Sequence, residues 1–190
     1  MDTESTRQEV KRAVAGVTTK AFNAPDASST KALLAKLRRG AGKPPGEVPE
    51  IFELTLGNLS ESANPQAENA VHIALTLFAV QQQGKRGNNG SVKFGRAVRQ
   101  IATGETNAEV ASDGVTKRFN TVLTAGSITE LSVHVRGLVK QCKEAAGIDF
   151  VEFALDLYDW QFDKESIAQK WGREFWQLTK STKIEGDNIQ

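Results

Sequence analysis

Several residue types that commonly carry chemistry are almost absent from this sequence. Its 190 residues include one cysteine, Cys142, and two histidines, His72 and His134. A single cysteine excludes an internal disulfide and a thiolate zinc site, and it indicates a reducing compartment. Both histidines lie in or beside apolar stretches, where a core position is commoner than a catalytic one. The two glycine-rich motifs of nucleotide-binding loops, G-x-G-x-x-G and G-x-x-x-x-G-K-[ST], do not occur in the sequence. We therefore expect no enzymatic activity, no metal, no cofactor and no small-molecule substrate.

The sequence also has no long apolar run. The longest, Val71–Val80, is interrupted by His72 and Thr76 and is too short to span a bilayer. The N-terminal stretch M-D-T-E-S-T-R-Q-E-V is polar and mixed in charge, unlike a signal peptide. These features predict a cytoplasmic protein without membrane contacts.

Strand-type alternation is missing as well, and every segment with a clear period shows the helical one. The predicted fold class is all-α, a globular bundle of about eight to nine helices with no sheet. Residues 1–190 form either a single helical subunit or two packed helical halves, about 1–106 and 107–190. The N-terminal half is expected to contain a helix over residues 4–22, a basic helix capped by Ser28 or Ser29 and ended by Gly40 and Gly42, and a short helix from Pro49 to Gly57. A helix capped by Asn64, with Pro65 in its first turn, should run to about Gln83, and another capped by Ser91 should run to Ala102. The remaining expected helices are Val115–Leu123, one opened by the capping box Ser127–Glu130 and ended by Gly147, 149–160 and 163–179.

The near-neutral composition conceals a segregation of charge. The formal net charge is +1, yet residues 27–143 hold fifteen basic and nine acidic side chains, a net charge of +6. Residues 144–190 hold five basic and ten acidic side chains, a net charge of −5. This pattern indicates an anionic partner for one surface and a different contact for the other. The carboxylates of Asp149–Asp163 are expected on a solvated or protein-binding helix surface.

Three helices each place cations on the face opposite their apolar residues. The segment Thr30–Gly46 has no acid, and its leucine face leaves its basic face in water. A single such face is usually a plain solvated surface, but three on separate helices weaken that interpretation. The cations expected to bind are Arg38, Arg39 and Lys43 in the first segment, Lys93, Arg96 and Arg99 in the second, Arg118, and Arg136, Lys140 and Lys143 in the third.

The basic faces carry no prominent aromatic residues for base stacking, because Phe94 and Phe119 suit the core and the tryptophans lie in the acidic part. The expected contact is therefore to nucleic-acid backbone, independent of base sequence. Two alternatives remain open: a stand-alone helical nucleic-acid-binding protein, and a scaffold subunit whose arginines bind acidic proteins.

A family resemblance lies in a series of segments in order along the chain. They are A-L-L-A-K-L-R-R-G-A-G-K-P-P-G, H-I-A-L-T-L-F-A-V-Q-Q-Q-G, S-V-K-F-G-R-A-V-R-Q-I-A, K-R-F-N-T-V-L-T-A, L-S-V-H-V-R-G-L-V-K and L-Y-D-W-Q. From about residue 28 to residue 178 the chain resembles the CasB family, the small subunit of the type I-E CRISPR surveillance complex, Cascade.

This resemblance implies a non-catalytic, all-α subunit present in two copies. It implies contacts with the backbone subunits that hold the guide RNA, with the large subunit, and with the target and displaced DNA strands of the R-loop. The acidic C-terminal region would suit protein contacts, for instance with the second copy. By position, the family's basic residues correspond to Arg38, Arg39, Arg96, Arg118 and Arg136, and the other five candidates come from helical wheels alone.

Overall fold

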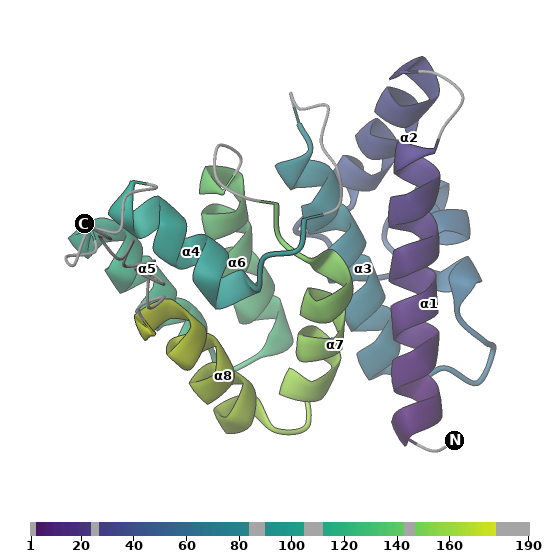
Figure 1. Ribbon diagram of the computed structural model, residues 1–190. Helices are drawn as coiled ribbons and strands as arrows, with labels where there is room; N and C mark the ends of the chain where they lie inside the picture. Colours follow the sequence, from purple (N-terminus) through teal and green to yellow (C-terminus); the bar gives the residue numbers. More distant parts are fainter. Residues whose placement is uncertain (1–2, 24–26, 84–89, 105–111, 143–146, 178–190) are drawn as a thin grey trace, which may run out of the picture.

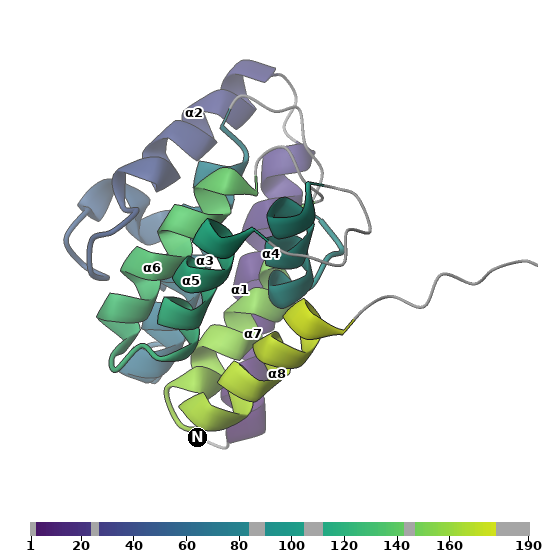
Figure 2. The ribbon, with the colours of Figure 1, turned by 90° about the vertical axis from the view of Figure 1, so that its left-hand side faces the viewer.

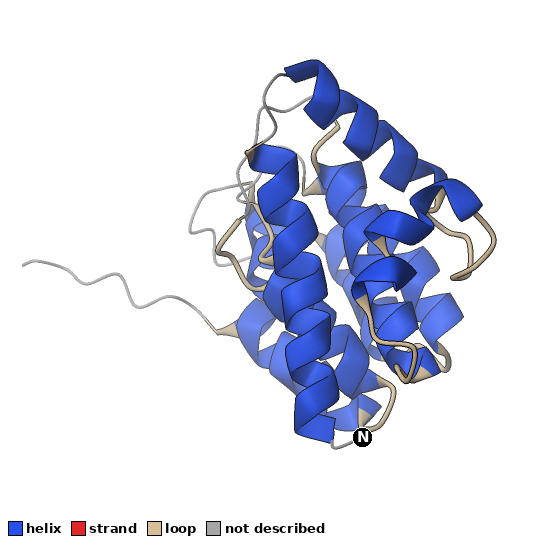
Figure 3. Ribbon diagram, turned by 90° about the vertical axis from the view of Figure 1, so that its right-hand side faces the viewer, coloured by secondary structure: helices blue, strands red, loops and turns tan. Residues whose placement is uncertain are grey.

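The computed structural model describes residues 3–23, 27–83, 90–104, 112–142 and 147–177. The described residues form eight α-helices and two short 3-10 helices, and none of them lies in a strand (Figure 1, Figure 3). The all-α prediction is therefore confirmed. The elements are α1 (Thr3–Phe22), α2 (Ala27–Arg39), η1 (Pro49–Leu54), η2 (Leu56–Asn58), α3 (Pro65–Gln81), α4 (Phe94–Thr103), α5 (Asp113–Leu123), α6 (Ile128–Gln141), α7 (Phe150–Trp160) and α8 (Lys164–Trp176).

Helix α3 is the centre of the bundle. Its residues from Ala70 to Gln81 are all buried, because its sequence is apolar nearly all round. Helices α1, α2, α6 and α7 pack against it. Asn64 caps its N-terminus by accepting a hydrogen bond from the Ala67 N–H at 2.9 Å, and Pro65 occupies the first turn, as predicted.

A second group of helices packs through aromatic side chains. Helix α4 lies on α8, and α5 lies between α4 and α6. The rings of Phe94 and Trp171 have centroids 4.9 Å apart, and those of Phe119 and Phe175 stack at 4.5 Å. Phe94 and Phe119 are thus in the core, as expected, and neither can stack on a base.

The two groups share one hydrophobic core, to which α7 contributes Phe150 and Phe153. Phe150 meets Phe78 of α3, while Phe153 meets Phe94 of α4. Just before α4 and α7, Val92 and Ile148 form an isolated parallel bridge. This bridge brings the first turns of α4 and α7 together. The division into halves of about 1–106 and 107–190 stays a prediction.

Helix boundaries contain most of the errors in the sequence analysis. Ser28 and Ser29 lie inside α2, which begins at Ala27, so neither is the predicted cap. Gly57 does not end a helix, because η1 ends at Leu54 and Gly57 lies within η2. Ser91 is not the cap of α4, since Lys93 is the N-cap residue and makes no side-chain capping bond.

The C-terminal ends of the predicted helices also differ. Helix α6 ends at Gln141, with Cys142 as its buried C-cap, rather than at Gly147. Its N-terminal capping box is present: the Ser127 hydroxyl accepts from the Glu130 N–H at 3.2 Å. Helix α8 ends at Trp176, and residues 178 and 179 of its predicted range lie outside the described part of the chain. No helix among the described residues is both long and apolar enough to cross a membrane.

Candidate nucleic-acid interface

The basic residues of α2 lie where this helix meets the end of α3. Leu34 and Leu37 are buried and hold α2 on the bundle, while Lys31 and Lys36 are exposed. Arg38 is half-buried, and its Nη1 donates to the Ala79 carbonyl in the last turn of α3 at 3.4 Å. That carbonyl lies at the negative end of the α3 dipole, which favours a cation there. Arg38 is therefore anchored by its tip.

The loop after α2, residues 40–46, is fixed to α3 by a histidine. His72 Nε2 lies 3.2 Å from the Gly40 oxygen and 2.9 Å from the Lys43 oxygen, so a protonated Nε2 donates to both carbonyls. Burial lowers the pKa of His72, although both carbonyls oppose this by stabilising the protonated ring. A side chain at Gly40 would lie 2.5 Å from Ile51 Cδ1, so the loop lies flat on the bundle. His72 is a core histidine, as predicted, but it also holds a basic loop in place.

The same loop contacts α6 through Arg136. A Cβ atom built on Gly42 would lie 2.6 Å from Nη1 of Arg136, which shows how closely the guanidinium approaches the loop backbone. Gly42 has φ = 86°, a conformation that glycine adopts without strain. Helices α2 and α6 lie toward the same edge of the molecule (Figure 2). Two of the three predicted basic faces, from Thr30–Gly46 and from α6, therefore meet at this contact.

Two cations of this surface already have carboxylate partners. Arg39 forms an ion pair with Glu50, and Lys43 Nζ lies 3.0 Å from a Glu47 carboxylate oxygen. The absence of acids between Asp26 and Glu47 in the sequence therefore does not carry over to the folded surface. All four side chains are about half exposed, and such pairs contribute about 0–1 kcal/mol each. An incoming phosphate can compete with them.

Of the remaining candidate cations on and beside α5 and α6, two are exposed and one lies outside the described residues. Lys140 is one turn beyond Arg136 on α6 and is exposed, without an ion pair among the described residues. Arg118 is exposed on α5, which packs against α6. Lys143 lies outside the described residues.

The predicted basic face of α4 is not arranged as its helical wheel indicated. Lys93 precedes the helix with an extended backbone, and its Nζ lies 3.6 Å from a Glu152 oxygen on α7. Arg96 and Arg99 are half-buried, and the Arg99 guanidinium lies 5.8 Å from the centroid of the Phe175 ring on α8. These contacts turn Lys93 toward α7 and Arg99 toward α8. Lys93 and Arg99 of the predicted α4 face thus contact α7 and α8 rather than the loop 40–46.

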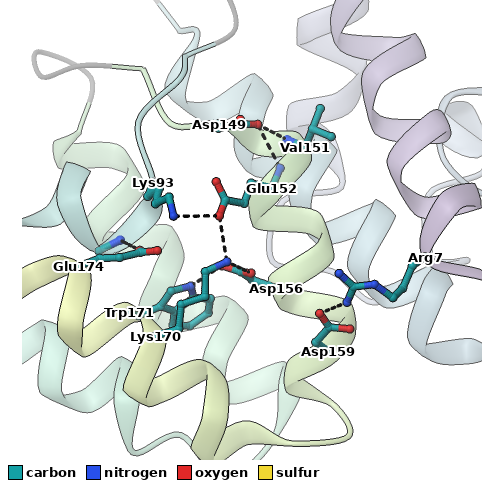
Figure 4. Close-up of polar contacts among 11 residues, drawn as sticks. Arg7, Lys93, Asp149, Val151, Glu152, Asp156, Asp159, Lys170, Trp171 and Glu174 are labelled. Carbon is teal, nitrogen blue, oxygen red and sulfur yellow. Dashed lines mark hydrogen bonds and ion pairs between the residues drawn. The ribbon is translucent and has the colours of Figure 1, made fainter. Parts of the chain in front are cut away.

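The sequence suggested that the acidic residues of α7 lie on a solvated or protein-binding surface, but not all of them do. Asp156 is only 4% exposed. Its Oδ1 accepts a hydrogen bond from Lys170 at 2.7 Å, and its Oδ2 accepts one from the Trp171 indole N–H at 2.7 Å (Figure 4). Lys170 also donates to Glu152 at 2.9 Å. The expectation fails for Asp156 because its position faces α8 rather than solvent.

The pKa values of the two carboxyls of this network shift in opposite directions. Burial raises the pKa of Asp156, although Lys170 and Trp171 pull it down. Burial also acts to raise the pKa of Glu152, but the hydrogen bonds and charges of Lys170 and Lys93 together outweigh it and hold that pKa below its ordinary value. The network joins α7 to α8 and holds Lys93 at its edge. It has the geometry of a structural clamp between helices.

The family follows from the sequence. The model of the CRISPR-associated protein Cse2 family matches residues 33–176. The chain belongs to the Cse2 family. Together with a structural neighbour called CasB, this match confirms the resemblance to the CasB family, the small subunit of the type I-E surveillance complex Cascade. No curated protein sequence matches the chain.

Solved structures of Cse2-family proteins share the fold. CasB from Thermobifida fusca is 26% identical with a TM-score of 0.69, over 90% of this chain and 98% of that one. CasB from Thermus thermophilus is 22% identical with a TM-score of 0.63, over 93% of this chain and 99% of that one. A chain described as part of a CRISPR RNA-guided surveillance complex is 17% identical with a TM-score of 0.67, over 90% of this chain and 92% of that one. At these lower identities the last two similarities show the fold alone.

All ten candidate cations fall within the region that matches the Cse2 family. Helix α1 lies before it, yet it packs on α3 and α7, and its Arg7 forms an ion pair with Asp159 of α7. The sequence analysis missed two structural roles, the loop contact of His72 and the Asp156–Lys170 pair. A histidine in an apolar helix and an aspartate flanked by Leu155 and Leu157 were the available signals.

Proposed function

We propose that this Cse2-family subunit binds nucleic-acid backbone through the surface formed by α2, the loop 40–46 and α6. The observation that carries the proposal is the contact of Arg136 with Gly42, which joins two basic segments distant in sequence. The proposed surface comprises Arg38, Arg39, Lys43, Arg136 and Lys140, with Arg118 beside it on α5. Lys93 is left out because it faces Glu152.

Such a surface suits phosphates better than bases. Its cations lie on helices and on a loop fixed by His72, and rigid cations are what backbone contacts require. Opening a DNA duplex against a guide RNA is close to balanced in free energy. A few added phosphate contacts can therefore decide whether the R-loop persists. This is the role we infer for the subunit, with no catalytic step of its own.

The proposal extends to the partners implied by family membership. They are the backbone and large subunits of Cascade, a second copy of this chain, the guide RNA, and the target and displaced DNA strands. The cytoplasm is the compartment where these components would meet. The acidic C-terminal region is the part we assign to protein contacts.

A salt titration of binding to a labelled oligodeoxythymidylate tests the backbone contacts on the full chain. Four simultaneous phosphate contacts predict a slope of about −3 in a plot of log K against log salt concentration. Tight binding without partners would favour the stand-alone alternative. Absence of binding by both the free subunit and the assembled complex would overturn the proposal.

A second test uses the assembled complex. The double variant Arg136→Gln/Lys140→Gln should shorten the R-loop lifetime about tenfold or more, the effect of losing at least one charge-assisted hydrogen bond. The double variant Lys164→Gln/Arg173→Gln on α8 removes the same charge from exposed positions and serves as the matched control. Equal R-loop lifetimes for the two variants would contradict the assignment of the surface.

One observation favours a second candidate function, that of a protein-binding scaffold. Arg39 and Lys43 already pair with carboxylates of this chain, as they would with an acidic partner protein. In that case the Arg136→Gln/Lys140→Gln variant would fail to assemble with the other subunits, whereas DNA binding by wild type would be unmeasurable.

A further inference from the structure

The loop 40–46 contains two glycines with the same backbone conformation and different surroundings. Gly42 has φ = 86° and Gly46 has φ = 90°, both in the left-handed region that other residues rarely adopt. A Cβ at Gly46 would meet no heavy atom within 4 Å. A Cβ at Gly42 would lie 2.6 Å from Arg136 Nη1 and 3.7 Å from its Cζ. Of these two glycines, Gly42 is therefore the one whose missing side chain leaves space that Arg136 occupies.

Arg136 lies against this loop, and no ion pair between it and another described residue is present. Its Nε is buried and has no hydrogen-bond partner, and no carboxylate within the described residues pairs with its guanidinium. A planar guanidinium fixed in this way is suited to an oxyanion such as a phosphate.

The loop backbone beside Arg136 is itself fixed. His72 holds the carbonyls of Gly40 and Lys43, and the Lys43 N–H donates to the Gly40 oxygen at 3.0 Å. The loop therefore cannot easily withdraw if a side chain is added at position 42. The flexible tip of Arg136 would move instead.

We propose that Gly42 is a positioning residue for Arg136, and that the two form one phosphate-binding site shared by the α2–η1 loop and α6. The site depends on the missing side chain at Gly42, which lets the guanidinium lie on the loop next to Lys43. Its ligand is a phosphodiester of a nucleic-acid strand. This inference rests on the function proposed above and assigns part of it to one contact.

The test compares Gly42→Ala with Gly46→Ala. Both variants carry similar left-handed strain, so that part of the fall in melting temperature is common to both, and Gly46→Ala serves as its control. Only Gly42→Ala displaces Arg136, and it should weaken binding to a labelled oligodeoxythymidylate about tenfold relative to Gly46→Ala, the loss of one charge-assisted hydrogen bond. Its salt slope should be smaller in magnitude by about 0.7, the contribution of one contact to a single strand.

A double-mutant cycle with Arg136→Gln separates positioning from a general disturbance of the loop. If Gly42 acts through Arg136, the double variant Gly42→Ala/Arg136→Gln binds as Arg136→Gln does. Full additivity of the two effects would overturn the positioning role. If either alanine variant is unfolded, Gly42→Asn and Gly46→Asn replace the pair, because asparagine tolerates the left-handed conformation better.

The outcomes distinguish this inference from the function on which it depends. If the wild-type chain and the assembled complex show no salt-dependent DNA binding, both the proposed function and the site fail. If wild type binds but Gly42→Ala and Gly46→Ala bind equally, only the Gly42–Arg136 site fails. If Arg136→Gln binds as wild type does, Arg136 is not part of the surface.

Discussion

Replacement of Lys170 by methionine is the most informative test of the clamp between α7 and α8. Lys170 donates to Asp156 at 2.7 Å and to Glu152 at 2.9 Å. Methionine keeps the aliphatic length of the side chain and removes the ammonium. Asp156 would then remain buried with the Trp171 indole N–H as its one described side-chain donor. An uncompensated buried carboxylate is the main source of the expected loss.

The expected loss of stability is smaller than for a fully buried pair. Removing one partner of a buried pair costs about 3–5 kcal/mol. The Lys170 side chain is 34% exposed, so solvent screens part of its interaction, and we expect about 2 kcal/mol. For a protein of this size, that corresponds to a fall in melting temperature of about 4–8 °C.

The loss should depend on pH in a defined direction. Lys170 acts to lower the pKa of both Asp156 and Glu152, so its stabilising effect is present while these groups are ionised. It is lost as the pH falls through the range of the carboxyls. The difference in stability between wild type and Lys170→Met should therefore be largest near neutral pH and smaller at about pH 4.

Urea and thermal unfolding followed by circular dichroism measure this difference. Lys164→Met is the control on the same helix, because Lys164 lies 3.9 Å from Glu165 with both side chains at least half exposed. In an Asp156→Asn background, Lys170→Met should cost only about 0.5 kcal/mol, as for an exposed pair. The reasoning is refuted if Lys170→Met costs no more than Lys164→Met, or costs the same in both backgrounds.

Three further predictions follow from local geometry. Gly95→Ala should lower the melting temperature by several degrees, because a Cβ there would overlap the α8 backbone, whereas Gly137→Ala on α6 meets nothing within 4 Å and should raise it slightly. Wild type should lose stability as the pH falls below about 6.5, since burial lowers the pKa of His72, and His72→Gln should flatten that loss in unfolding curves. Lys140→Ala should reduce the salt slope of single-stranded DNA binding by about 0.7 while Lys93→Ala leaves it unchanged, and equal slopes for both would contradict the proposed surface.

The fold class was within reach of the sequence because helical periodicity is a local property. Apolar spacing located α3 and the start of α6, and the caps Asn64 and Ser127 were identified from residue type alone. The predicted caps were wrong at α2, where Ser28 and Ser29 lie inside the helix, and at α4, where Lys93 rather than Ser91 is the N-cap residue. Boundaries of that kind depend on packing rather than on one residue.

The candidate site was harder to predict from the sequence than the fold was. A helical wheel gives the direction of a side chain relative to its own helix, but not what faces it. The helical wheel placed Lys93 beside Arg96, but the N-cap of α4 lies two residues later than predicted, at Lys93 itself, and the Lys93 side chain faces Glu152. The pairing of Lys43 with Glu47 and the meeting of Arg136 with Gly42 depend on loop conformation and on helix packing. Neither can be read from periodicity.

The central position of α3 has a consequence for how the chain folds. Nearly all of its surface is covered, by α1 and α2 from the N-terminal part and by α6 and α7 from the C-terminal part. A fragment ending near residue 106 would expose the apolar side of α3 that α6 and α7 cover. We therefore expect such a fragment to aggregate, and the complete chain to unfold in a single cooperative transition rather than in two steps. During synthesis, the apolar surface of α3 would then be covered only when α6 and α7 have been made.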